Sequence, residues 1–436
     1  MTYAEAVARL LGLRRGEITG MQPGLERIEA LLDTLGHPES RYALVQVGGT
    51  NGKGSTAAMI AAILKAAGRR VGLYTSPHLV SFRERIRVNG VPITEDAVVD
   101  GMDALGTQIA RTDATMFESA TALALDHFAH EGVDVAVLEV GLGGRGDATT
   151  IGRPAATVLT HIDIDHEEWL GSTIESIADA KAAIIRSGTA ISSAQAPAAR
   201  AIIERRAAEM RVPLLIEGRD LHVAVRSSGV DGLRIDCRGP EWALDDLALP
   251  LLGAHQPGNA LAAIAAARVV GADDAAIRTG LARVRWPGRL SIVRRDPWLI
   301  LDGAHNPDGA RALATSLKAL FGDGVRAAFV VGVYADKDAR GIFEALSPIA
   351  SRFILTKVPG ERSAEPEALA GMLRDRPAMV TRSVAEALSV AGAGRGTPIV
   401  CVAGSLALVG EALKTITGTD KPCSIENGAD SIDLLS

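Results

Sequence analysis

A glycine-rich loop between an apolar run and a helix-like stretch limits the fold of this chain more than any other feature. Residues 42–47 have the length and apolar character of a strand, residues 48–55 read Gly-Gly-Thr-Asn-Gly-Lys-Gly-Ser, and residues 56–67 have helical composition. In such a strand–loop–helix unit, backbone N–H groups and the positive end of the helix surround phosphate oxygens. Lys53 adds a full charge, and the Ser55 hydroxyl suits Mg²⁺. The unit predicts a nucleoside triphosphate site.

The spacing of this loop departs from the plain Walker pattern. One residue is missing between Gly48 and Gly52, and Gly54 separates Lys53 from the hydroxyl residue. A glycine-rich surface turn is therefore the alternative interpretation. The strand before the loop and the helix after it favour phosphate binding.

Length and charge restrict the class of protein. A chain of 436 residues has room for two or three domains, and 47% hydrophobic with 22% charged residues is ordinary for a globular enzyme. The formal charge of −6 argues against nucleic acid or an anionic membrane as a general partner. Three widely spaced cysteines indicate neither a disulfide framework nor a cysteine zinc site. We recognise no signal peptide or membrane-spanning run, so a cytoplasmic protein is expected.

Strand and helix patterns alternate twice along the chain, with a break at residues 286–289, Trp-Pro-Gly-Arg. The first run predicts strands at 71–74, 133–140 and 156–160, antiparallel strands within 221–249, and helices at 26–35, 116–130, 173–186, 259–270 and 273–283. The second run predicts strands at 299–301, 325–331, 352–355 and 399–402, and helices at 308–320, 339–346 and 385–391. We therefore expect an α/β protein with a phosphate-loop domain over residues 1–288, built on a parallel-rich sheet, and a Rossmann-like domain over residues 289–436. The polar stretch after Thr415 predicts a loosely ordered tail.

Polar side chains follow several apolar strands of the first half. Ser76, Glu139 and His166 each come after such a strand, where the catalytic groups of open α/β sheets gather. A hydroxyl, a carboxylate and an imidazole could together hold Mg²⁺, although imidazole is an unusual ligand for that hard ion. Glu139 could instead be a polar cap at a strand end, and His166 could equally be a surface loop histidine.

The second half offers weaker candidates. Asp302 and His305 lie where a predicted strand runs into a loop, and either ligand contact or local capping would explain them. Ser405 follows the last predicted strand and is explained by a helix N-cap alone. Lys181 lies inside a predicted helix, where a solvated surface lysine is the default interpretation.

Several short motifs occur together and in order. They are Gly-Thr-Asn-Gly-Lys-Gly-Ser at 49–55, Tyr-Thr-Ser-Pro-His-Leu at 74–79 with Phe-Arg-Glu-Arg-Ile at 82–86, Glu-Val-Gly-Leu-Gly-Gly-Arg at 139–145 with Asp-Ala-Thr at 147–149, Asp-His at 165–166 with Trp-Leu-Gly at 169–171, His255-Gln256 with Asn259, Pro-Gly-Arg at 287–289, and Asp-Gly-Ala-His-Asn-Pro at 302–307. As a set they are specific. The sequence resembles the folylpolyglutamate synthase/dihydrofolate synthase branch of the Mur-type ATP-dependent amide ligases.

This resemblance implies a nucleotide site and a metal site. The residues implied in ATP binding are Thr50, Asn51, Gly52, Lys53, Gly54, Ser55, Asn259, Arg289 and Asp302. Mg²⁺ would be held by Ser76, Glu139 and His166. Lys181 falls where family members carry a lysine that can become carbamylated and help a second Mg²⁺.

The resemblance also implies the substrates. Dihydropteroate or a folate would be activated by ATP as an acyl phosphate and then joined to L-glutamate, with Lys53, Lys181 and His305 as the catalytic residues. The pterin side of the site would include Phe117, Glu118, Arg145 and Asp147, and the incoming glutamate would meet His305 and Ser405. Small molecules would be the only partners, with neither nucleic acid nor membrane among them, and a monomer is expected. Which of the two pterin acids is used, or whether both are, does not follow from the sequence.

Three departures from the family pattern affect substrate preference more than the type of reaction. The helix around Lys181 reads Ala-Lys-Ala-Ala-Ile rather than Glu-Lys-Ala-Gly-Ile, Gly146 and Thr150 replace leucine and asparagine, and residues 22–27 match only loosely.

Two other functions compete with this interpretation. A muramyl-peptide ligase would share the fold and the chemistry but act on a nucleotide-sugar peptide precursor. The motifs at 76–79 and 302–307 favour the folate branch. A phosphate-loop motor or nucleotide-switched binding module would hydrolyse ATP without forming an amide, but the sequence lacks the basic stripes and interleaved aromatic residues that would support it.

Overall fold

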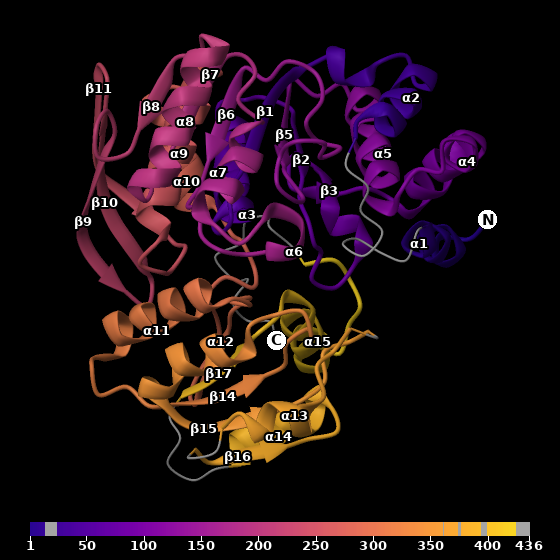
Figure 1. The fold of residues 1–436 in the computed structure, drawn as a ribbon. Helices are drawn as coiled ribbons and strands as arrows, with labels where there is room; N and C mark the ends of the chain where they lie inside the picture. The colour runs from indigo at the N-terminus through magenta and orange to yellow at the C-terminus, as the bar shows by residue number, and fades with distance from the viewer. Residues whose placement is uncertain (14–23, 361, 374–375, 394–398, 424–436) are drawn as a thin grey trace.

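Two separate β-sheets, each covered by helices, organise the chain in the computed structural model (Figure 1). The structure describes residues 1–13, 24–360, 362–373, 376–393 and 399–423. The first sheet uses strands from the first half of the chain, and the second uses strands from residue 291 onward. The α/β architecture predicted from the sequence is confirmed.

The first sheet has eight strands in the order β4-β3-β2-β5-β1-β6-β7-β8. Their bounds are β1 (Ala43–Gly48), β2 (Val71–Tyr74), β3 (Ile86–Val88), β4 (Val91–Pro92), β5 (Val135–Glu139), β6 (Ala156–Leu159), β7 (Thr189–Ser192) and β8 (Leu214–Ile216). Strands β2, β5, β1, β6, β7 and β8 run parallel, whereas β3 and β4 join antiparallel at one edge. Because β1 lies between β5 and β6, the glycine-rich loop leaves the sheet near its centre.

Alternate residues of the parallel strands bury opposite faces of this sheet, as the two-residue period of a strand requires. Val45 and Val137 pack in the cluster of α3 (Lys53–Ala66), α9 (Gln256–Val269) and α10 (Asp274–Arg283), whereas Leu44 and Leu138 pack on the opposite face. The helices of that opposite face are α1 (Tyr3–Gly12), α2 (Glu26–Thr34), α4 (Glu95–Thr112) and α5 (Met116–His130). The short helix α6 (Glu167–Leu170) and the helices α7 (Ile174–Ala182) and α8 (Pro197–Met210) complete this half of the molecule.

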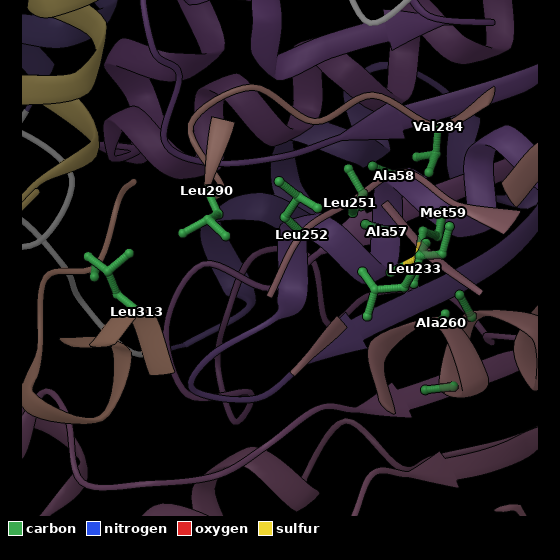
Figure 2. Packing of buried hydrophobic residues seen from close by; sticks show 14 of the residues in the cluster. Ala57, Ala58, Met59, Leu233, Leu251, Leu252, Ala260, Val284, Leu290 and Leu313 are labelled. Atoms are coloured by element: carbon green, nitrogen blue, oxygen red, sulfur yellow. The ribbon is translucent and has the colours of Figure 1, made fainter. Parts of the chain in front are cut away.

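Helix α3, which begins in the glycine-rich loop, packs very closely against α10. Figure 2 shows part of the apolar cluster around it. A Cβ atom added at Gly280 of α10 would lie only 2.4 Å from the Ile63 Cα of α3. A three-stranded antiparallel sheet, formed by β9 (His222–Gly229), β10 (Gly232–Gly239) and β11 (Trp242–Leu249), packs against the same cluster. These strands confirm the antiparallel stretch predicted within residues 221–249.

The second sheet has six strands in the order β12-β13-β17-β14-β15-β16. The strands are β12 (Ser291–Arg295), β13 (Trp298–Leu301), β14 (Ala327–Val331), β15 (Ala350–Leu355), β16 (Ala378–Val380) and β17 (Ile399–Ala403), and the helices are α11 (Pro307–Phe321), α12 (Ala339–Leu346), α13 (Pro366–Gly371), α14 (Val384–Ala393) and α15 (Leu406–Thr417). All pairs except β12–β13 are parallel. Buried side chains of α11 and α12 pack with Phe329 on one face, and those of α14 and α15 pack with Val330 on the other.

Some elements differ from the sequence prediction. Helices α4, α6, α8 and α13 and strands β3, β4, β7, β8, β12 and β16 are not predicted, because these strands have only two to five residues and α4 contains two glycines that dilute its helical pattern. Helix α7 ends at Ala182 rather than at residue 186. The predicted loose tail begins too early, since α15 continues to Thr417 and Cys423 is hydrogen-bonded to the first half of the chain. The rest of that tail, residues 424–436, and residues 22 and 23 of the loosely matching stretch lie outside the described residues.

No helix in the described part of the chain is both long and apolar enough to cross a membrane.

Candidate nucleotide and ligation site

A cavity of about 530 Å³ lies where loops from both sheets meet. The loops that follow β1, β2, β5 and β6 of the first sheet line it, and so do those that follow β13 and β17 of the second. Sixteen of the residues that the sequence predicted for the site are in its wall: Thr50, Asn51, Gly52, Lys53, Gly54, Ser55, Ser76, Phe117, Glu139, His166, Lys181, Asn259, Arg289, Asp302, His305 and Ser405. Because parallel strands carry their carboxyl ends to the same edge, this is where a ligand site of an open α/β sheet is expected.

The glycine-rich loop needs its glycines. Gly49 and Gly52 have φ angles of 137° and 92°, in the region that favours glycine. A Cβ at Gly49 would lie 2.0 Å from the Thr160 Oγ1, and one at Gly52 would lie 2.5 Å from the Asn259 Oδ1. The chain therefore passes too close to its neighbours for any side chain, and α3 begins directly at Lys53 with its N-terminus at the cavity.

Lys53 turns back onto the loop that carries it. Its Nζ donates to the carbonyl oxygens of Gly49 and Thr50 at 3.2 and 3.0 Å. Burial lowers the pKa of Lys53, while the nearby carboxylates of Glu139 and Asp165 oppose that shift. An ammonium held at a helix N-terminus by carbonyl groups can move a short distance to meet a phosphate group.

The three candidate metal ligands share the cavity wall. The Ser76 backbone N–H donates to Glu139 Oε2 at 3.1 Å, which ties the loops after β2 and β5 together. Burial lowers the pKa of His166 to about 3, so its imidazole is neutral at neutral pH, the form that binds metals. A hydroxyl, a carboxylate and a neutral imidazole fit a divalent cation as donors, with the imidazole the least usual partner for Mg²⁺.

Lys181 is buried rather than solvated, which corrects the default interpretation from the sequence. The side chain is 3% exposed, and its Nζ donates to the Gly49 carbonyl oxygen at 3.0 Å. Burial, followed by the positive charge of Lys53, lowers the pKa of Lys181 to about 7. About half of these amines are thus neutral near pH 7.

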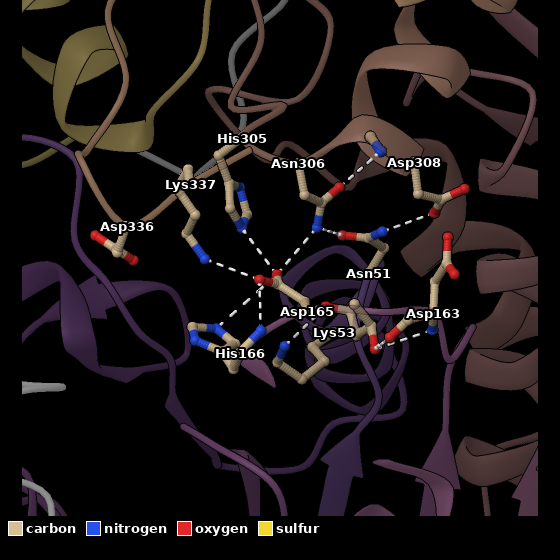
Figure 3. A network of polar contacts seen from close by, with 12 residues as sticks. Asn51, Lys53, Asp163, Asp165, His166, His305, Asn306, Asp308, Asp336 and Lys337 are labelled. Atoms are coloured by element: carbon tan, nitrogen blue, oxygen red, sulfur yellow. Dashed lines mark hydrogen bonds and ion pairs between the residues drawn. The ribbon is translucent and has the colours of Figure 1, made fainter. Parts of the chain in front are cut away.

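Asp165 connects the two halves of the site, as Figure 3 shows. Its carboxylate accepts hydrogen bonds from Lys337 Nζ at 2.9 Å and Asn306 Nδ2 at 3.0 Å, and it lies 3.8 Å from His305 Nε2. Burial acts to raise the pKa of Asp165, but the charges of His166, Lys337 and His305 hold it well below its usual range. The sequence motifs contain Asp165 and Asn306 but gave neither a role in the site, and Lys337 was not a candidate.

A second set of contacts joins the same two halves of the site. Asn51 Nδ2 donates to Asp308 Oδ2 at 2.7 Å, and Arg311 pairs with Asp163 at 3.3 Å and with Asp308 at 3.4 Å. His161 lies 3.7 Å from Asp308 and completes a group with metal-ligand spacing. The guanidinium of Arg311 already supplies positive charge to both carboxylates of that group.

Asp302 and Ser405 both make local capping hydrogen bonds and line the cavity. Asp302 accepts hydrogen bonds from the backbone of Leu290 at 2.7 Å and Ala304 at 2.8 Å, and Ser405 caps α15 by accepting from Ala407 at 3.1 Å. His305, whose Nδ1 lies 2.9 Å from the Gly303 carbonyl oxygen, lines the cavity too, and burial lowers its pKa.

The residues predicted for the pterin side separate into two groups. Phe117 lines the cavity, whereas Glu118, Arg145 and Asp147 are not part of its wall. Glu118 forms a capping box with Thr115 at the start of α5 and accepts a hydrogen bond from Arg27 at 2.9 Å. Arg145 pairs with Asp179 at 3.0 Å on the surface, and Asp147 is buried within its own loop, where it accepts from the Leu142 N–H at 2.9 Å.

Comparisons with known proteins agree with this arrangement. Residues 47–267 match the Mur ligase middle domain, and residues 288–406 match the Mur ligase glutamate ligase domain. The fold is thus that of a Mur-type ligase.

Individual relatives show to which branch of the Mur-type ligases the chain belongs. Folylpolyglutamate synthase of Lacticaseibacillus casei is 37% identical over 382 residues, which cover 84% of this chain and 88% of that protein. The solved structure of Escherichia coli FolC in complex with DHPP and ADP has a TM-score of 0.88 at 34% identity and covers 96% of this chain and 98% of its own. The chain belongs to the folylpolyglutamate synthase/dihydrofolate synthase family.

The chain spans about half the length of some relatives. A probable bifunctional folylpolyglutamate synthase/dihydropteroate synthase of Halobacterium salinarum is 37% identical over 449 residues, which cover 100% of this chain but 54% of that protein.

Proposed function

We propose that this chain is an ATP-dependent ligase that joins L-glutamate to the carboxyl group of dihydropteroate, of a folate, or of both. One observation carries the proposal. A single cavity holds a phosphate loop with Lys53 on one side, and on the other side the loops that follow β13 and β17, with His305 and Ser405. The Escherichia coli structure with DHPP and ADP belongs to a relative of similar fold, which supports a pterin acid and a nucleotide as ligands here.

The reaction would proceed in two steps. The substrate carboxylate attacks the γ-phosphorus of ATP, so that an acyl phosphate forms and ADP leaves. The glutamate amine then attacks the acyl carbon, the amide bond forms, and inorganic phosphate leaves as the amine loses a proton. Lys53 and the N-terminus of α3 would stabilise the charge on the transferring phosphoryl group.

Metal ions would assist at two neighbouring positions of the site. Ser76, Glu139 and His166 would hold Mg²⁺, which when bound neutralises negative charge on the phosphates. Lys181 has a neutral amine in a large fraction of molecules at neutral pH, and only a neutral amine can react with CO₂ to give a carbamate. We propose that carbamylated Lys181 helps to hold a second Mg²⁺.

Residues 1–288 and 289–436 would act as two domains that approach each other in each catalytic cycle. An acyl phosphate hydrolyses in water, so closing the gap beside Asp165 would protect it and align the glutamate amine. Crosslinking the two parts in an open state should abolish ligation. We also propose that the enzyme is a cytoplasmic monomer, which a single monomeric peak in size-exclusion chromatography with light scattering would support.

Product analysis tests the proposed function. The purified chain would be incubated with ATP, Mg²⁺ and L-glutamate, together with dihydropteroate, tetrahydrofolate or a UDP-muramyl-peptide precursor, and products measured by mass spectrometry. We expect a mass increase of one glutamyl residue, with ADP release, for at least one pterin acid and none for the muramyl precursor. Glu139→Ala should silence the reaction. A product from the muramyl precursor alone, or ATP consumption without any amide, would contradict the proposal.

A further inference from the structure

A buried carboxylate outside the cavity gathers backbone groups from two distant parts of the chain. Glu84 is 5% exposed and accepts hydrogen bonds from the backbone N–H groups of Leu79 at 2.9 Å and of Val80 and Ser81 at 3.1 Å. Its Oε1 also accepts from the Cys423 N–H at 3.1 Å. Residues 76–81, which we call the Ser76 loop, are thus joined through one carboxylate to a segment that follows α15.

The same segment is held a second time. Arg87 is 2% exposed, and its Nη2 donates to the Cys423 carbonyl oxygen at 3.0 Å, while its Nε donates to the Glu84 carbonyl oxygen at 3.1 Å. The backbone N–H and carbonyl groups of Cys423 are therefore both hydrogen-bonded to buried charged residues of the first half. Hydrogen bonds to charged groups contribute more than neutral ones and are costly to leave unmade when buried. We call residues 418–423 the C-terminal strap.

The Ser76 loop also packs directly on the second half of the molecule. Leu79 and Val80 pack against the apolar cluster that contains Val409 of α15. A Cβ atom added at Gly410 would lie 1.9 Å from the Leu79 carbonyl oxygen, so the helix backbone touches the loop. A small cavity beside the main one is lined by Ser76, Glu139 and Cys423 together, which places the strap next to two candidate metal ligands.

We propose that Glu84 is a positioning residue through which docking of the C-terminal strap fixes Ser76 for metal binding at the nucleotide site. Three N–H groups of the loop share this carboxylate with Cys423, so the strap orders a loop whose first residue is a candidate ligand. The metal side of the site is then complete only when the second half of the molecule is docked. This inference rests on the proposed function for the role of the metal, but its structural core does not require ligation.

Two truncated chains separate the strap from the residues beyond it. One ends at Gly418 and lacks Cys423, and the matched control ends at Glu426 and keeps it. Hydrogen exchange would follow the amides of residues 79–81, which we expect to exchange about fivefold to tenfold faster in the chain ending at Gly418. The chain ending at Glu426 should exchange like the full chain. Unchanged exchange after loss of the strap would overturn the proposal.

Metal affinity gives the functional readout. Mn²⁺ binding in the presence of ADP, measured by electron paramagnetic resonance, should weaken about fivefold in the chain ending at Gly418, while metal-free ADP binding stays unchanged. Glu84→Gln should weaken Mn²⁺ binding similarly, and Glu95→Gln, which removes an exposed partner of Arg83, should not. A loss of ADP and Mn²⁺ binding in equal measure would indicate a merely structural role and would refute the proposal. Neither measurement needs amide formation, so a failed ligase assay would remove the proposed function and leave this result standing.

Discussion

The two loops that face each other across the cavity are built in different ways. Residues 48–55 after β1 use backbone conformation: two glycines with positive φ, a helix N-terminus, and a lysine folded onto the loop carbonyls. Residues 302–307 after β13 use side chains, with Asp302 capping the turn, His305 facing the cavity, and Asn306 both starting α11 and bonding to Asp165. A backbone loop is preformed, whereas side-chain contacts between the two halves would break and re-form in the proposed movement of the two domains.

The largest expected effect tests the preformed loop. Lys53→Ala should lower kcat/KM by on the order of 10²–10³-fold, because one cation that stabilises transition-state charge is lost. Lys65→Ala is the matched control, since Lys65 lies in the same helix but bonds the Asn89 carbonyl oxygen on the surface. Steady-state kinetics of ADP release would measure both variants. Equal losses in the two would show that the position of Lys53 has no special value.

The second prediction tests the side-chain contacts that join the two halves of the site. Asp165→Asn removes the charge that joins Lys337 and His305 to the first half, and it should lower kcat on the order of tenfold to a hundredfold through misalignment. Arg311→Ala removes an exposed ion pair across the same gap and should change kcat less than about threefold. Stopped-flow and small-angle scattering with nucleotide would show whether closure is impaired. An undiminished kcat in Asp165→Asn would mean that this bridge is dispensable.

The behaviour of Lys181 with pH would sharpen the comparison, because this amine bonds the preformed loop. With a pKa of about 7, the neutral amine that reacts with CO₂ is the minor form at pH 6 and the main form at pH 8. At a constant concentration of dissolved CO₂, the rate of carbamate formation should therefore rise about tenfold over that interval. A ¹³C signal from labelled bicarbonate, absent in Lys181→Met, would report it. A rate that rises only above pH 9 would indicate an ordinary solvated lysine.

The smallest effect concerns packing between the halves. Gly410→Ala places a methyl group against the Leu79 carbonyl, so it should lower kcat by a few fold and the melting temperature by a few degrees. Gly392→Ala is the control, because a Cβ there meets nothing within 4 Å and alanine favours a helix by up to about 1 kcal/mol. Calorimetry of the two variants would give shifts of opposite sign if the contact matters.

The sequence predicted the preformed loop better than the contacts that close the site. Glycine, lysine and serine at fixed spacing predict a phosphate loop because the local backbone geometry requires those residues. The family resemblance located Lys181, but its burial depends on the packing of α7 against the loop, which no local pattern encodes. The contacts of Lys337 and Asn306 with Asp165 were not predicted because they form only through tertiary structure. The strap was missed for the same reason, since Cys423 lies 339 residues from Glu84.

The close approach of Gly280 to Ile63 has a consequence far from the place where it occurs. Helix α3 is a rigid rod, and ten residues at about 1.5 Å each separate that contact from Lys53, roughly 15 Å away. Any side chain at position 280 would push on one end of the rod and tilt the other, where triphosphate is expected to rest. A random search for inactive but folded mutants should therefore return substitutions at Gly280, remote from every reacting atom.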